Sequence, residues 1–181
     1  MSHFIRLRHL LWTGLCMLGC AAGLAQAADP VEELDLKAAY IFNFIQFIEW
    51  QDGDQAIDGE WSLCVSPFSP LKRHLTALEG KPARKGQPIR VRLLEPGMLR
   101  QCRVLILHSS DIEPVLRALR ALPSAHGILT VADEVANNSP EIMITLSQQQ
   151  SRIVFGVNTE AAARAGLSVS SRLLRLAKAA K

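Results

Sequence analysis

The sequence lacks the motifs with which most enzymes of this size hold substrates and cofactors. No glycine-rich phosphate loop follows an expected strand, and Gly86 and Gly97 are isolated glycines of the kind found in turns. The nucleophile motif Gly-x-Ser-x-Gly is absent. His74, His108 and His126 lie far apart, with no two at the spacing of metal ligands. We therefore expect no enzyme, no metal site, no catalytic residue and no cofactor.

A long membrane-spanning run is also absent. The apolar run at residues 10–22 is short for a bilayer core of about 30 Å, so a retained membrane anchor is the disfavoured alternative. Arg6 and Arg8 precede this run, and Ala25-Gln26-Ala27 supplies a small-x-small cleavage site. The pattern predicts a signal peptide at residues 1–27, cleaved near Ala27, and export to the periplasm. A loose lipoprotein box that ends at Cys20 leaves acylation as a second processing route.

Cysteine is scarce once the signal is removed, because only Cys64 and Cys102 remain. In an oxidising compartment a disulfide between them is the default, and two buried thiols are the alternative. Removal of Arg6 and Arg8 also lowers the formal net charge from +3 to +1, so the basic character belongs largely to the signal.

Charge is segregated along the remaining chain. Residues 29–60 hold nine acidic side chains against Lys37 alone, whereas residues 61–120 hold eleven basic against four acidic ones. Either the two surfaces attract each other within the fold, or one is a polar surface for a partner. Nucleic acid is not an expected partner outside the cytoplasm.

Strand and helix patterns alternate along the chain and end in a hairpin. Short apolar runs predict strands at 61–65, 89–94, 104–107, 128–131, 142–146 and 153–158, and the run at 104–107 suits the middle of a parallel sheet. Helices are expected at 34–50, at 71–78 and from a cap at Ser110 or Asp111 to Leu122. Residues 147–151 form the expected hairpin turn. We therefore predict one three-layer α/β domain over residues 28–181, with a mainly parallel sheet, a C-terminal antiparallel hairpin and helices on both faces.

The C-terminal stretch predicts a strand, a helix, a kink and a second helix. The strand at 153–158 is so apolar that we expect both of its faces to be covered, inside the sheet. Asn158 suits the cap of the next helix, and Gly166 can adopt the positive φ that ends it. Leu173, Leu174 and Leu176 are expected on the apolar side of the final helix.

The helix at 34–50 is apolar on most sides. Its apolar residues recur at helical spacing, and its other flank carries Tyr40, Phe44 and Phe47. A core helix under the sheet explains this composition, and an apolar face left open for a partner is the alternative.

Several segments in this order resemble the YfiR family of periplasmic regulators, and the resemblance covers essentially the whole mature chain. They are Lys37-Ala38-Ala39-Tyr40-Ile41-Phe42-Asn43-Phe44, Phe47-Ile48-Glu49-Trp50, Leu63-Cys64-Val65, Cys102-Arg103-Val104-Leu105, Ile128-Leu129-Thr130-Val131, Phe155-Gly156-Val157-Asn158, Ala165-Gly166-Leu167 and Ser170-Ser171-Arg172-Leu173-Leu174. Cys64 and Cys102 match the disulfide positions of the family. The chain departs from the family where Asn138-Ser139-Pro140 replaces a Gly-Gly pair, and it lacks a second cysteine pair.

The resemblance implies a small α/β protein that binds the periplasmic domain of an inner-membrane diguanylate cyclase of the YfiN type. Binding would repress cyclic di-GMP synthesis and biofilm formation, and an outer-membrane lipoprotein of the YfiB type would relieve the repression. A homodimer is a further expectation. The alternative function is a periplasmic binding module for a small ligand that feeds another membrane sensor.

A protein of this kind needs an exposed apolar or aromatic surface, because such surfaces drive association. The aromatic flank of the first helix and the basic side of the last helix are the candidate partner-binding regions. Their residues are Tyr40, Phe44, Phe47, Arg172 and Arg175.

Overall fold

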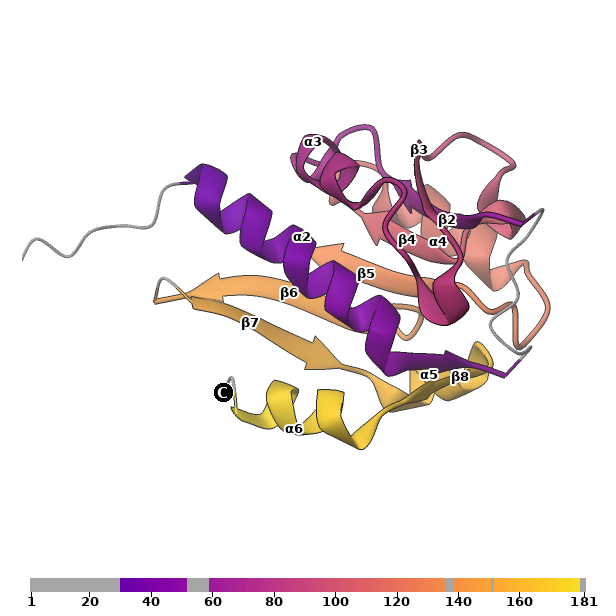
Figure 1. The fold of residues 1–181 in the computed structure, drawn as a ribbon. Helices are drawn as coiled ribbons and strands as arrows, with labels where there is room; N and C mark the ends of the chain where they lie inside the picture. Colours follow the sequence, from indigo (N-terminus) through magenta and orange to yellow (C-terminus); the bar gives the residue numbers. More distant parts are fainter. Residues whose placement is uncertain (1–29, 52–58, 136–138, 151, 180–181) are drawn as a thin grey trace, which may run out of the picture.

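The computed structural model describes residues 30–51, 59–135, 139–150 and 152–179. The expected signal peptide, its cleavage site and the alternative acylation site Cys20 lie outside these residues. A central sheet carries helices on both faces, which confirms the expected three-layer α/β fold (Figure 1).

Six strands form the central sheet in the order β3-β2-β4-β5-β6-β7. Neighbouring strands from β3 to β6 are parallel, and β6 and β7 are antiparallel. The strands are β2 (Trp61–Val65), β3 (Ile89–Leu93), β4 (Val104–Leu107), β5 (Leu129–Asp133), β6 (Ile144–Gln149) and β7 (Arg152–Val157). The mainly parallel sheet with a C-terminal antiparallel hairpin is therefore confirmed.

Each face of the sheet packs against its own hydrophobic core, and β4 contributes side chains to both cores. Val104 and Ile106 join the core that contains α2 (Pro30–Phe47), α3 (Lys72–Leu75) and the following 3₁₀ turn η1 (Thr76–Leu78). Leu105 and Leu107 join the core on the opposite face, which contains α4 (Ile112–Arg120). A strand covered on both faces must be apolar at every position, which is why this short run lacks alternation.

The first helix ends three residues earlier than predicted. Residues 48–50, expected as its last turn, form β1 (Ile48–Trp50), which pairs antiparallel with β8 (Leu167–Val169). Ile48 and Trp50 are still buried, because alternate residues of a strand point to the same face. The indole N–H of Trp50 donates to the carbonyl of Gly127 at 2.7 Å, which holds the extended segment in place.

The strand predicted at 153–158 is β7, and it lies at the edge of the sheet rather than inside it. Ile153 and Phe155 are buried on one face, whereas Val154 is half-buried and Gly156 is exposed on the other. The expectation of two covered faces is therefore wrong. Antiparallel strands commonly bury one face only, and the apolar residue types on the open face concealed this alternation.

The helix α5 (Thr159–Arg164) begins as predicted, since Oδ1 of Asn158 accepts from the backbone N–H of Ala161 at 3.0 Å. Gly166, at φ +76°, follows it. The expected kink is instead the short strand β8, and α6 (Ser171–Ala179) follows. Leu173 is buried, but Leu176 is 50% exposed, so the final helix turns this leucine away from the core.

Smaller differences concern the ends of elements. β6 extends to Gln149, so the hairpin turn is tighter than predicted, and Ser151 within it lies outside the described residues. The basic loop after η1 contains the 3₁₀ turn η2 (Arg84–Gly86), and a further turn, η3 (Leu99–Gln101), precedes β4. Asp111 occupies the cap position of α4, but its side chain makes no capping hydrogen bond.

Candidate partner-binding surface

The C-terminal end of α2 packs against the start of α6. The backbone N–H of Ser170 donates to the carbonyl of Phe47 at 3.1 Å. The guanidinium carbon of Arg172 lies 5.2 Å from the centroid of the Phe47 ring, within the range of a cation–π interaction. The fold thus brings together Phe47 and Arg172, which the sequence places 125 positions apart.

Three aromatic rings from α2 and β7 form one cluster. The ring centroids of Phe44 and Phe155 are 5.0 Å apart, and the ring of Tyr40 lies 6.2 Å from Phe44 and 5.8 Å from Phe155. Phe44 is fully buried, whereas Tyr40 and Phe47 are half-buried. Core packing therefore accounts for Phe44, whereas the other two predicted rings, Tyr40 and Phe47, reach the surface.

The same two helices, α2 and α6, each carry an exposed leucine. Leu36 is 46% exposed and Leu176 is 50% exposed. On α2, Leu36 precedes Tyr40 by four residues and Phe47 by eleven, which is about three turns, so the three side chains share one side of the helix. On α6, Leu176 follows Arg172 by four residues. We name these five residues, Leu36, Tyr40, Phe47, Arg172 and Leu176, the α2–α6 stripe.

Arg175 lies beside the stripe on α6. Its side chain is exposed, and its guanidinium donates to Oγ of Ser171 at 3.5 Å. A long exposed arginine next to apolar side chains is a common component of protein interfaces. Arg175 therefore remains a candidate for partner binding together with Arg172.

A buried charge cluster lies between α2 and β5. Nζ of Lys37, whose side chain is 2% exposed, lies 2.7 Å from Glu33, 2.8 Å from Asp133 and 3.0 Å from Glu134. Glu134 also accepts from the backbone N–H of Gln148 at 2.7 Å, so the cluster reaches β6 as well. From the sequence, Lys37 was identified as the single base of residues 29–60, but its burial within a charge cluster was not predicted. Its position as the single base among nine acids, four residues after Glu33, was the available signal.

The environment shifts the titration of this cluster. Burial disfavours the charged form of Lys37, but the adjacent carboxylates of Asp133, Glu33 and Glu134 outweigh it and raise the pKa of Lys37 above its usual range. Burial raises the pKa of Asp133, and the contact with Lys37 opposes that shift. The cluster connects α2 to β5 structurally, because its lysine is already surrounded by carboxylates.

Acidic and basic surfaces meet at β3, at the other edge of the sheet. Glu60 contacts the guanidinium groups of Arg90 at 3.1 Å and Arg92 at 2.6 Å, and Glu79 contacts Arg90 at 2.9 Å. Glu79 also accepts from the backbone N–H of Val91 at 2.7 Å and so occupies part of the free edge of β3. The contacts of Glu60, the last residue of the acidic segment, join that segment to two arginines of the basic one. The same guanidinium contacts lower the pKa of Glu60.

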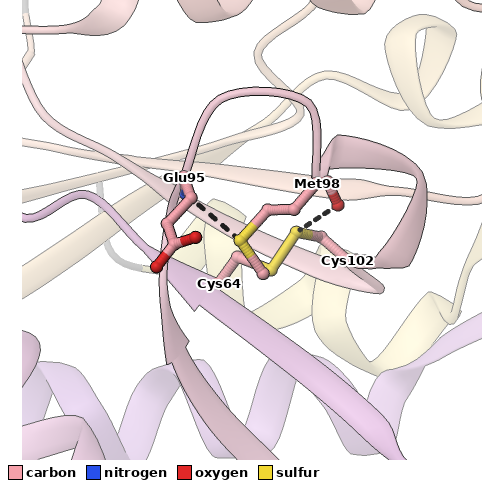
Figure 2. Close-up of a disulfide and its surroundings, with 4 residues drawn as sticks. All are labelled: Cys64, Glu95, Met98 and Cys102. Carbon is pink, nitrogen blue, oxygen red and sulfur yellow. Dashed lines mark hydrogen bonds between the residues drawn. A yellow bond between two sulfur atoms is a disulfide. The ribbon is translucent and has the colours of Figure 1, made fainter.

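A disulfide joins Cys64 in β2 to Cys102, which lies just before β4 (Figure 2). Both cysteines are buried. The connecting loop folds over the bond, with the backbone N–H of Glu95 donating to Sδ of Met98 at 3.1 Å. The disulfide is thus part of the smaller of the two cores, the one that contains α4. There it holds the loop against the central strands β2 and β4.

The described residues contain no group of three or more His, Cys, Asp or Glu side chains arranged to hold a metal ion. The three histidines of this part of the chain have separate local roles: His74 contacts Asp35 at 2.6 Å, and His108 and His126 each accept a backbone N–H. Among the helices described here, none is long and apolar enough to cross a membrane.

These features define a single α/β domain whose helices α2 and α6 leave apolar side chains half exposed. A family model described as YfiR/HmsC-like matches residues 34–178. The chain therefore belongs to the YfiR/HmsC-like family, as the sequence resemblance indicated. The family is regulatory rather than catalytic and is associated with cyclic di-GMP signalling. No curated protein matches the chain.

Proposed function

We propose that this protein binds the periplasmic domain of an inner-membrane diguanylate cyclase and represses its synthesis of cyclic di-GMP. Membership of the YfiR/HmsC-like family supports a role in this signalling. The α2–α6 stripe carries the proposal, because it leaves two large apolar side chains, Leu36 on α2 and Leu176 on α6, about half exposed. Apolar side chains gathered on one surface are typical of sites that bind other proteins.

The stripe also suggests the chemistry of the partner surface. Its apolar residues would fill a shallow apolar groove on the cyclase, and Arg172 and Arg175 would face acidic side chains at the rim. Arg172 is already oriented by its contact with the Phe47 ring, so binding would cost little additional side-chain entropy there. The inhibitor would act by stoichiometric binding and would need no catalytic residue.

The proposal includes the cellular setting. The protein would be exported by its signal peptide and act in the periplasm, where an outer-membrane YfiB-type lipoprotein would sequester it and release the cyclase. A second copy of the chain could occupy the same stripe. Repression would then depend on whether the cyclase, the lipoprotein or a second copy of the chain is bound to the stripe.

The test is a binding assay between the mature protein and the purified periplasmic domain of the cognate cyclase. We expect Leu36→Asp and Leu176→Asp each to weaken binding at least about tenfold, because each places a charge in an apolar contact. Leu93→Asp is the matched control, since Leu93 is 52% exposed on β3 outside the stripe.

The cellular counterpart is deletion of the gene, which should raise cyclic di-GMP and surface attachment when the cyclase is expressed. Reintroduction of Leu36→Asp should fail to restore repression, whereas Leu93→Asp should restore it. Unchanged cyclic di-GMP after deletion would contradict the inhibitor function. Equal loss of binding in all three variants would contradict the role of the stripe.

A further inference from the structure

An apolar groove of about 410 Å³ opens where three parallel strands end. Pro67 follows β2, Leu94 follows β3, and Asp111 follows β4 at the start of α4, and all three line the groove. Leu99 and Val115 add further apolar wall. The volume falls within the range of about 300 to 1,000 Å³ that is typical of sites for small molecules.

The strand order places this groove at a topological switch point. From β2 the chain passes through α3 to β3 on one side, whereas β4, on the other side of β2, leads through α4 to β5. The helices α3 and α4 cover opposite faces of the sheet. Open α/β sheets hold ligands in the crevice at the carboxyl ends of strands where the direction of winding changes.

Asp111 lines the groove and carries an acceptor atom that has no hydrogen-bond partner among the described residues. An aspartate at a helix cap normally accepts from the second or third helical residue, but the third residue of α4 is Pro114, which has no N–H. The side chain of Asp111 makes no capping hydrogen bond, and within the described part of the chain its Oδ1 is buried without a hydrogen-bond partner. A buried acceptor without a partner costs free energy, and a rotation of the Asp111 carboxylate toward a donor in the groove would recover it.

The charged side chains that line the groove determine which kind of hydrogen-bond donor a ligand should carry. Glu95 is a second carboxylate in the groove, and no basic side chain is among its lining residues, all of which the structure describes. We propose that the groove binds a small organic cation, namely a protonated amine with an aliphatic or aromatic body. The ammonium donates to Asp111, and the body packs on Leu94, Leu99 and Val115. Amine binding in this groove would be independent of the repression of a cyclase.

The wall of the groove is preorganised. Residues 94–99 belong to the loop that the Cys64–Cys102 disulfide anchors, and the contact between Glu95 and Met98 shapes its tip (Figure 2). A loop held in this way loses little conformational freedom when a ligand binds.

The test is a nuclear magnetic resonance titration of the intact mature protein with 2-phenylethylamine. We expect saturable shifts of the backbone amides at 94–99 and 111–118. The neutral analogue 2-phenylethanol should bind at least about tenfold more weakly, because it lacks the charge-assisted hydrogen bond. Asp111→Asn should weaken amine binding by a similar factor, and because the Asp111 side chain makes no capping hydrogen bond, asparagine of the same shape should keep the fold.

Glu113→Gln is the matched control, since it removes one negative charge from the same helix without touching the lining of the groove. Its affinity for the amine should equal that of the unmodified protein. Equal affinity for the amine and the alcohol, shifts confined to other surfaces, or no shifts at millimolar amine would each overturn the proposal. Equal affinity in Asp111→Asn would also overturn it.

Discussion

The ammonium of Lys37 lies 2.8 Å from Oδ1 of Asp133 and so joins helix α2 to the carboxyl end of β5. The two side chains are 2% and 5% exposed, so this contact lies inside the protein. A buried charge is costly unless an opposite charge accompanies it, and each member of the pair therefore requires the other. The contact fixes where the first helix sits on the sheet.

We predict that Lys37→Met lowers the free energy of unfolding by about 3 kcal/mol, because it leaves Asp133 buried without its counter-ion. Chemical denaturation measures the change. Lys72→Met is the matched control, because Lys72 is an exposed lysine whose Nζ donates to the carbonyl of Pro67. A second substitution, Asp133→Leu, should recover part of the loss, and equal stability of Lys37→Met and the unmodified protein would contradict the prediction.

The same lysine should give the protein a specific alkaline instability. The carboxylates hold the pKa of Lys37 above the ordinary value of 10.5, so the folded state keeps a proton that the unfolded state loses. The stabilisation that protonated Lys37 provides is complete while the pH lies below the ordinary pKa. This stabilisation is lost as the pH rises through the folded-state pKa. Between about pH 10 and about pH 11 the free energy of unfolding should fall more steeply in the unmodified protein than in Lys37→Met, by up to about 1 kcal/mol. Parallel pH profiles would argue against this role.

The Cys64–Cys102 disulfide should support the smaller core. The bond spans 38 residues, and Cys64→Ala should lower the free energy of unfolding by about 2 to 5 kcal/mol. Reduction of the unmodified protein should have a similar effect. Labelling of unfolded, unreduced protein with a thiol reagent should detect no free cysteine in the mature chain, and two reactive thiols would disprove the bond.

Trp50 should contribute to stability through the hydrogen bond of its indole N–H. Its indole N–H donates to the carbonyl of Gly127 at 2.7 Å, and its ring meets Trp61 edge-on at 4.6 Å between centroids. Trp50→Phe keeps an aromatic ring but removes this donor from a buried carbonyl, so we expect a loss of about 1 to 3 kcal/mol in thermal or chemical denaturation. A variant as stable as the unmodified protein would show that the hydrogen bond contributes little.

Export should leave a mature chain that starts near Ala28. The small-x-small site predicts cleavage after Ala27, and mass spectrometry of the protein from the periplasmic fraction measures the new N-terminus. Ala27→Arg should slow processing, because the cleavage site requires a small residue there. An acylated Cys20 as the first residue would instead support the lipoprotein route.

The sequence by itself determined the fold class and most of the elements. Val104-Leu105-Ile106-Leu107 is apolar at every position because both faces of β4 are covered, and such a run predicts a central parallel strand without any knowledge of its neighbours. Asn158 and Gly166 marked the two ends of α5, because capping and positive φ are local requirements of the backbone. The sequence was sufficient to predict an element wherever a residue affects only the backbone of its own segment.

Only the tertiary structure decided the features that depend on distant partners. The strand β7 is at the edge because no further strand of the described residues pairs with it. Residues Ile48 to Trp50 leave the helix because Leu167 to Val169 offer an antiparallel partner. Lys37 is buried because three carboxylates converge on it from two elements. Likewise, the surface parts of the candidate site, Tyr40 and Phe47, could be separated from the buried Phe44 only once β7 and α6 were in place. Burial is a property of the packed neighbours, which local periodicity does not encode.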